Sequence, residues 1–194
     1  MDYTQGTEEA KQRRAKKHML WFGIVSLSMT FAGFTSAYVV SKERPDWLEN
    51  LEIPQAFFIS LALIIVSSIT MHFAKKNVVA ERNRTGSLLL WATFLLGVAF
   101  VYFQIKGYMD VVNESGITFT GPTSNITHTF IFLIAWVHVL HVAAGLISIL
   151  VVIYNHYKLR YTNGKTLGIE LAATFWHFVD FLWIYLFLFF YFVR

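Results

Sequence analysis

Five long apolar runs dominate this sequence and restrict what it can fold into. The runs cover residues 19–40, 55–74, 87–105, 128–154 and 169–193. Each has about 20 residues or more, enough to cross the hydrocarbon core of a bilayer as a helix. Because lipid offers the backbone no hydrogen-bond partner, such a run has to be helical, and none shows the alternation of a membrane β-strand. The sequence therefore predicts an all-α bundle of five transmembrane helices.

The composition agrees with a membrane protein. Of the 194 residues, 56% are hydrophobic and only 14% are charged, whereas soluble domains carry about 25% charged residues. The chain contains no cysteine, which excludes disulfides, thiolate metal sites and a cysteine nucleophile. We expect one membrane domain over residues 19–194, preceded by a basic cytoplasmic tail over residues 1–18.

The basic residues predict the orientation of the helices. They gather in three segments: Lys11, Arg13, Arg14, Lys16 and Lys17; Lys75, Lys76, Arg82 and Arg84; and Lys158, Arg160 and Lys165. Cytoplasmic loops carry an excess of Lys and Arg, so the N-terminus is predicted in the cytoplasm and the C-terminus outside. These clusters are topology signals, and we therefore predict no nucleic-acid partner.

The last two apolar runs contain ionisable residues at membrane depth. His138 and His141 lie three apart on one helix face, and Glu170, His177 and Asp180 lie on the final run. Ionisable side chains in a membrane are costly and indicate function or buried pairing. We expect the two faces to meet, with a histidine of run 128–154 near Asp180 or His177.

Three interpretations of these polar residues remain open. The first is a buried network that fixes helix register, because buried polar groups are normally paired. The second is a proton or lipid-headgroup site, and the third is a metal or haem site, since histidine and aspartate ligate transition metals. Few other polar groups stand at this depth to support metal ligands.

The first and last runs differ in side-chain size. Ser28, Ala32, Gly33 and Ser36 make run 19–40 a candidate packing face, within the chain or against a partner. Aromatic residues crowd run 169–193, which we expect to face lipid and the membrane interface.

Two motifs resemble subunit III of the haem–copper oxidases. Glu170 followed by Trp-His-Phe-Val-Asp at 176–180 and by Trp183 is similar to that family's last helix. His138-Val-Leu-His141-Val-Ala-Ala-Gly145 is similar to its preceding helix. Phe103-Gln104 is a weaker match. The resemblance covers essentially the whole chain and corresponds to the short, five-helix bacterial form of cytochrome c oxidase subunit III.

The resemblance implies a non-redox subunit of a proton-pumping oxygen reductase in the bacterial inner membrane. It implies docking on subunit I, association with subunit II, bound structural phospholipid, support of proton uptake, and haem and copper only in the partner subunits. A larger respiratory supercomplex is a further possible partner. No residue of this chain is assigned as catalytic or as a metal ligand. The residues that match the family motifs are interpreted as a structural and lipid-associated polar network: His138, His141, Glu170, His177, Asp180 and Trp183.

Two alternatives and one departure accompany this interpretation. A subunit of a quinol oxidase or a nitric oxide reductase-associated homologue would share the same motifs. A stand-alone intramembrane metal or haem protein would instead use His138, His141 and His177. The family usually has a glutamate in the helix that matches run 19–40, and this chain has no carboxylate there. That glutamate's role cannot be transferred to this chain.

Overall fold

Five long helices form the whole of the described fold. This is a computed structural model, which describes residues 7–45, 47, 54–115, 125–162 and 164–193. The helices are α1 (Glu8–Ser41), α2 (Gln55–Val79), α3 (Asn83–Ser115), α4 (Ile126–Tyr157) and α5 (Leu167–Val193). All five are long and apolar enough to cross a membrane. The predicted all-α class and the five predicted spans are therefore confirmed.

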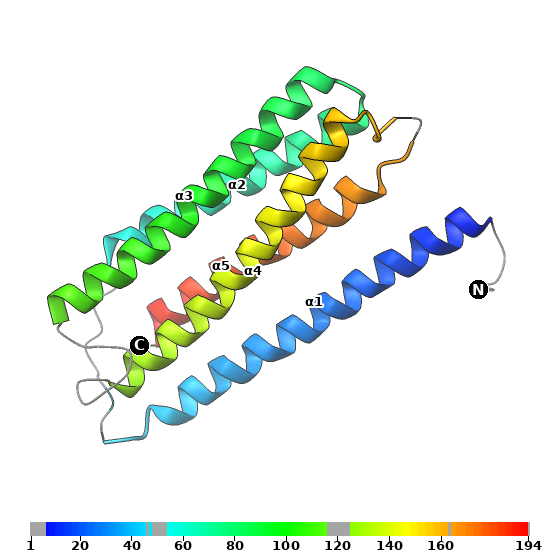
Figure 1. Cartoon of the computed structure of the whole chain (residues 1–194). Coiled ribbons are helices and arrows are strands. Elements are labelled where there is room, and N and C mark those ends of the chain that lie inside the picture. The colour runs from blue at the N-terminus through cyan, green and yellow to red at the C-terminus, as the bar shows by residue number, and fades with distance from the viewer. Residues whose placement is uncertain (1–6, 46, 48–53, 116–124, 163, 194) are drawn as a thin grey trace.

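Helices α2 to α5 pack as a four-helix group, and α1 lies along its side. Contacts join α2 to α3, α3 to α4, α4 to α5 and α5 back to α2. Helix α1 contacts only α4 and α5 among the major helix pairs, and it stands apart from α2 and α3 (Figure 1). Helix α1 begins at one end of the bundle and α5 ends at the other (Figure 1).

Helix α1 begins well before the predicted apolar run. Residues 8–18, expected as part of the tail, continue the helix outward from the apolar segment. The Thr7 side chain accepts a hydrogen bond from the amide of Ala10, and Glu8 and Glu9 occupy the first turn. Both features stabilise a helix N-terminus. The 34-residue helix is about 50 Å long, well beyond a hydrocarbon core of about 30 Å.

Helix α3 is also longer than the sequence predicts. It continues past Ile105 to Ser115, through Gly107, where we expected the helix to have ended. Gly107 is a close-packing residue here, because a Cβ at this position would lie 3.0 Å from Cε1 of Phe57 and 3.2 Å from Cβ of Ala56. The side of α2 supports this turn of α3, so one glycine does not end the helix.

Helix α5 occupies a central position, in contrast to the expected lipid-facing one. It packs against α1, α2 and α4. Trp176, Trp183, Leu186 and Phe190 are buried, while Phe181 and Phe192 are exposed. The aromatic residues of α5 therefore divide between core and surface, because a helix with three neighbours leaves only a narrow face for lipid.

Trp176 of α5 contacts the other three helices of the four-helix group. Its side chain is fully buried, and its Nε1–H donates to Oγ of Ser67 on α2 at 3.1 Å. A Cβ at Gly97 of α3 would lie 2.7 Å from Cη2 of Trp176, and one at Gly145 of α4 would lie 2.9 Å from its Cε3. The indole from α5 thus fits between helices that approach closely at two glycines.

Candidate functional site

His138 of α4 lies in an aromatic enclosure. Its side chain is fully buried, and its ring stacks on Trp183 of α5, with centroids 5.1 Å apart and planes at 24°. Phe100 of α3 and Phe31 of α1 contact the ring edge-on at 5.9 Å and 6.3 Å. Within the described part of the chain, neither ring nitrogen has a hydrogen-bond partner. His138 therefore brings four helices together through ring contacts.

His141 differs from His138 in that one of its ring nitrogens has a hydrogen-bond partner. Its Nδ1 bonds the backbone carbonyl of Val137 in its own helix at 2.7 Å. Its ring also contacts Phe31 of α1, with centroids 5.9 Å apart. His141 thus belongs to the seam between α1 and α4.

His177 of α5 faces α2 and not α4. Its Nδ1 lies 2.7 Å from Oγ of Ser68, one residue after the Ser67 that bonds Trp176. Its ring centroid lies 6.5 Å from that of His72, also on α2. Adjacent serines of α2 therefore bond adjacent residues of α5.

Asp180 lies one turn beyond His177 on the same side of α5. The residue is 2% exposed, so it lies in the interior of the bundle. Among the residues that the structure describes, none is in hydrogen-bonding geometry with either carboxylate oxygen. Asp180 is thus a buried carboxyl group, one helical turn from the His177 that bonds Ser68.

We expected a histidine of α4 near Asp180 or His177, and the contact that the structure shows between these faces is a ring contact. The two faces do meet, because His138 stacks on Trp183. Yet no hydrogen bond in the described ranges joins either histidine of α4 to His177 or Asp180. The reason is the rotation of α5 about its axis, which directs His177 toward Ser68 on α2. One sequence signal could have indicated that α2 carries the partner of His177. It is the polar patch Ser67-Ser68-Ile69-Thr70 inside an apolar run.

Glu170 is separate from these membrane-depth residues. It lies in the first turn of α5, where Oε1 accepts from Arg13 Nη2 at 2.6 Å and from Thr166 Oγ1 at 2.7 Å. Lys17 Nζ lies 2.7 Å from its Oε2. Both cations belong to the N-terminal part of α1, so Glu170 joins α1 to the start of α5.

A second polar contact joins α1 and α5 at their other ends. Lys42, which follows α1, donates from Nζ to the carbonyl oxygen of Val193 at 2.7 Å. A cation at a helix C-terminus is favourable because the last carbonyls and the helix dipole attract it. Between the two ends, Thr35 and Tyr185 hydroxyls lie 3.3 Å apart.

The candidate packing face of α1 remains uncovered by this chain. Ser28, Ala32, Gly33 and Ser36 are all exposed. A Cβ at Gly33 would meet no atom within 4 Å. Packing of this face within the chain is thus not observed, and packing against a partner stays a prediction.

Gln104 is a further buried polar residue near the expected loop end of α3. Its Nε2 donates to Oγ of Ser60 on α2 at 2.8 Å, and that hydroxyl donates to the carbonyl of Phe57. The Phe103-Gln104 pair thus contributes a polar link between α2 and α3.

His177 contacts a different helix from the two histidines of α4. The rings of His138 and His141 both contact Phe31 of α1, whereas His177 contacts Ser68 and His72 of α2. Over the described residues, no group of three or more His, Asp or Glu side chains could hold a metal ion.

Known proteins resemble this chain along nearly its whole length. Residues 5–194 match the family described as cytochrome c oxidase subunit III. Cytochrome c oxidase subunit 3 of Corynebacterium diphtheriae is 31% identical over 175 residues, covering 86% of this chain and 82% of that protein. Cytochrome bo(3) ubiquinol oxidase subunit 3 of Buchnera aphidicola is 26% identical over 182 residues, covering 92% of this chain and 94% of that protein.

A third relative is of the same kind as the second. Cytochrome bo(3) ubiquinol oxidase subunit 3 of Pseudomonas aeruginosa is 27% identical over 173 residues, covering 86% of this chain and 79% of that protein. The similarity agrees with the motifs on α4 and α5 and with the five membrane-spanning helices. The chain is a multi-pass membrane protein and belongs to the cytochrome c oxidase subunit III family.

Proposed function

We propose that this chain is the non-redox subunit III of a proton-pumping haem–copper oxidase in a bacterial cytoplasmic membrane. The observation that carries the proposal is the family match over residues 5–194. The oxidation chemistry of such a complex would take place outside this chain. The family match supports that assignment, because it is to subunit III and covers residues 5–194.

The proposed role is to stabilise subunit I beside subunit II. The exposed small-residue face of α1 supports a docking role, since Ser28, Ala32, Gly33 and Ser36 would let another helix approach closely. Haem and copper are assigned to the partner subunits, and structural phospholipid is the ligand proposed for this one. Support of proton uptake is part of the proposal, although α1 offers no carboxylate within its apolar run.

A quinol oxidase is the second candidate complex. It is favoured by the two relatives named as subunits of ubiquinol oxidases, whose identity to this chain is 26% and 27%. A cytochrome c oxidase is favoured by the relative at 31% identity. The donor-specific subunit that purifies with this chain distinguishes the two, because a copper-binding subunit II indicates cytochrome c as the donor.

Purification from native membranes in mild detergent tests the proposal. The full chain would carry an affinity tag, and co-purifying proteins would be identified by mass spectrometry. We expect subunits I and II in stoichiometric amounts, together with haem absorption and oxygen consumption of the purified complex. Recovery of the chain alone, or with proteins that contain no oxidase subunit, from membranes that reduce oxygen would contradict the assignment.

A further inference from the structure

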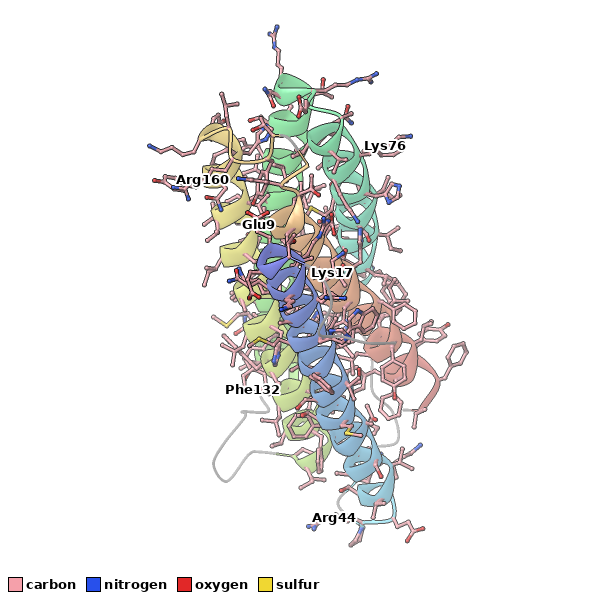
Figure 2. The ribbon with its side chains drawn as sticks, turned by 90° about the vertical axis from the view of Figure 1, so that its right-hand side faces the viewer. Glu9, Lys17, Arg44, Lys76, Phe132 and Arg160 are labelled. Carbon is pink, nitrogen blue, oxygen red and sulfur yellow. The ribbon has the colours of Figure 1, made fainter. Side chains whose placement is uncertain are left out.

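A polar cluster joins α3 and α4 at the end of the bundle where Lys76 and Arg160 lie (Figure 2). The hydroxyl oxygen of Tyr157, the last residue of α4, accepts hydrogen bonds from Oγ of Ser87 and from Nε1 of Trp91 on α3, each at 3.1 Å. A hydroxyl oxygen accepts two hydrogen bonds and donates one. The two donors from α3 therefore occupy the phenol oxygen, and its own proton is left to donate elsewhere.

This hydroxyl group lies on the outer surface of the bundle. Tyr157 is 63% exposed. Ser87 is the first residue of the apolar run of α3, and Tyr157 lies just beyond the apolar run of α4. Both residues therefore lie where a span leaves the hydrocarbon core, which is the depth of the lipid headgroups and the place where Tyr and Trp are enriched in membrane proteins.

Two cations flank the hydroxyl group of Tyr157. Arg84 lies three residues before Ser87 and so on the same face of α3. Lys158 follows Tyr157, with its Nζ 5.8 Å from the ring centroid of Tyr154 one turn earlier. Both cations are exposed. A hydrogen-bond donor and two positive charges therefore converge on one patch of surface.

The surrounding charge also favours an anion at this patch. The two turns that meet at this end, residues 75–84 and 158–165, contain seven basic residues and one acid, Glu81. Basic clusters beside membrane-spanning helices attract the negative headgroups of anionic lipids.

An apolar surface continues from the cluster toward the middle of the bundle. It is formed by exposed side chains of α3 and α4: Leu88, Trp91, Leu95, Ile147, Val151 and Tyr154. On each helix these residues recur at spacings of three and four, so they form one stripe per helix. Trp91 bonds Tyr157, and Tyr154 lies one turn from it, so both stripes begin at the polar cluster. A cationic, hydrogen-bonding patch above apolar stripes matches a phospholipid.

We propose that Tyr157, Arg84 and Lys158 bind the phosphate group of an anionic phospholipid, whose acyl chain lies along the stripe of α3. The O–H of Tyr157 donates to a phosphate oxygen, and the two cations balance the negative charge. Ser87 and Trp91 are positioning residues, because their hydrogen bonds orient the phenol toward the headgroup. An anionic headgroup is preferred because the amine of a zwitterionic lipid would add a third cation to the patch.

This inference rests on the phospholipid-binding part of the proposed function and gives it a location and a headgroup class. The site uses neither α1 nor α5, so it is separate from the surface proposed to dock on subunit I. Its test measures lipid contact directly. A failed lipid site would leave the subunit assignment intact, whereas a failed subunit assignment appears in the co-purifying proteins.

Photo-crosslinking of the purified complex tests the site, with phosphatidylglycerol that carries a diazirine in one acyl chain. Mass spectrometry should map the crosslinks to residues 88–95 and 147–154. In Tyr157→Phe, which keeps the ring, we expect the lipid concentration for half-maximal crosslinking there to rise about tenfold, equivalent to about 1.4 kcal/mol. Tyr102→Phe is the matched control, because Tyr102 is 62% exposed but lies about three turns from Trp91 on α3. Equal concentrations for Tyr157→Phe and wild type overturn the proposal.

A second pair of variants tests the headgroup class and decides the question if Tyr157→Phe fails to fold. Arg84→Gln combined with Lys158→Gln should reduce crosslinking of phosphatidylglycerol to the level of a phosphatidylethanolamine with the same diazirine chain. Lys75→Gln combined with Lys76→Gln removes the same charge from the same end and should leave the preference unchanged. Equal crosslinking of the two lipids in wild type overturns the proposal, as does full displacement of phosphatidylglycerol by inorganic phosphate, which would indicate a site for a free anion.

Discussion

Trp176 shows how a single residue coordinates several helices of this protein. Its indole ring reaches from α5 to Gly97 on α3 and Gly145 on α4, and its N–H bonds Ser67 on α2. Lipid tails are as apolar as the side chains between helices, so close packing and interhelical hydrogen bonds have to stabilise the bundle. Both are concentrated at this tryptophan.

Enlarging Gly97 should therefore destabilise the four-helix group. The new methyl group of Gly97→Ala would lie 2.7 Å from both Cη2 of Trp176 and Cδ2 of Leu146. Overpacking of this kind costs about 1–3 kcal/mol, and it should lower the thermal unfolding midpoint of the purified protein. Gly23→Ala is the control, because nothing lies within 4 Å of a Cβ there. Equal midpoints for the two variants would show that Trp176 does not pack as described.

At the scale of the helices, α1 is attached mainly along one seam and at its two ends. Phe31 and Tyr38 are buried against the other helices, while much of the rest of α1 is exposed. Glu170 binds the N-terminal part through Arg13 and Lys17, and Lys42 binds the last turn of α5. Electrostatic contacts therefore join α1 to α5 at both of its ends.

Glu170→Gln should loosen the N-terminal part of α1. The Arg13 and Lys17 side chains are 44% and 46% exposed and Glu170 is 20% exposed, so each ion pair contributes about 0.2–1 kcal/mol. Hydrogen exchange of residues 8–20 should be faster in this variant than in wild type at low salt. The difference should shrink at high salt, where exposed charges are screened.

The Glu8–Lys11 ion pair supplies the control for that measurement. Both partners belong to α1 and are 80% and 38% exposed, so Glu8→Gln removes an ion pair without affecting the contact with α5. It should change exchange across residues 12–20 much less than Glu170→Gln. If the two variants behave alike, Glu170 does not hold α1 in place.

The small-residue face of α1 makes a different prediction. Ala32→Leu adds bulk at an exposed position, so the unfolding midpoint of the isolated chain should stay unchanged. Recovery of subunit I with the variant should fall, because a larger side chain prevents close helix approach. Ala62→Leu, at an exposed position of α2, is the matched control. Unchanged recovery of subunit I with Ala32→Leu would exclude this face as the docking surface.

At the scale of the whole molecule, charge differs between the two ends of the bundle. Lys76 and Arg160 lie at one end and Arg44 lies at the other (Figure 2). The positive-inside rule assigns the Lys76 end to the cytoplasm. Because the chain contains no cysteine, an introduced cysteine is the only thiol in this chain, which makes its labelling unambiguous within the subunit.

Labelling with a membrane-impermeant maleimide should reveal that orientation. In intact spheroplasts, Arg44→Cys should react and Arg160→Cys should not. Inverted membrane vesicles should give the opposite result. Detergent-solubilised samples, in which both positions should react, control for accessibility. Labelling of Arg160→Cys in spheroplasts would reverse the proposed topology.

The sequence predicted the helices better than it predicted their contacts. Lipid requires an apolar run to be helical, so the five spans followed from length alone. The ends of the helices could not be predicted from the length of the apolar runs. Capping by Thr7 extends α1 beyond its run, and the contact of Gly107 with Phe57 extends α3. Periodicity placed His177 and Asp180 on one face of α5. It could not give the rotation that directs this face toward Ser68, since that depends on how all four helices pack.

The most direct measurement of the central claim is the distribution of haem and copper when this chain is removed from the purified oxidase. Stepwise detergent treatment would release it, and both fractions would be analysed for metal and visible absorption. The account predicts that all haem and copper stay with the remaining subunits, which keep their initial rate of oxygen reduction. Stoichiometric haem or copper in the released chain, lost in His141→Ala, would contradict it.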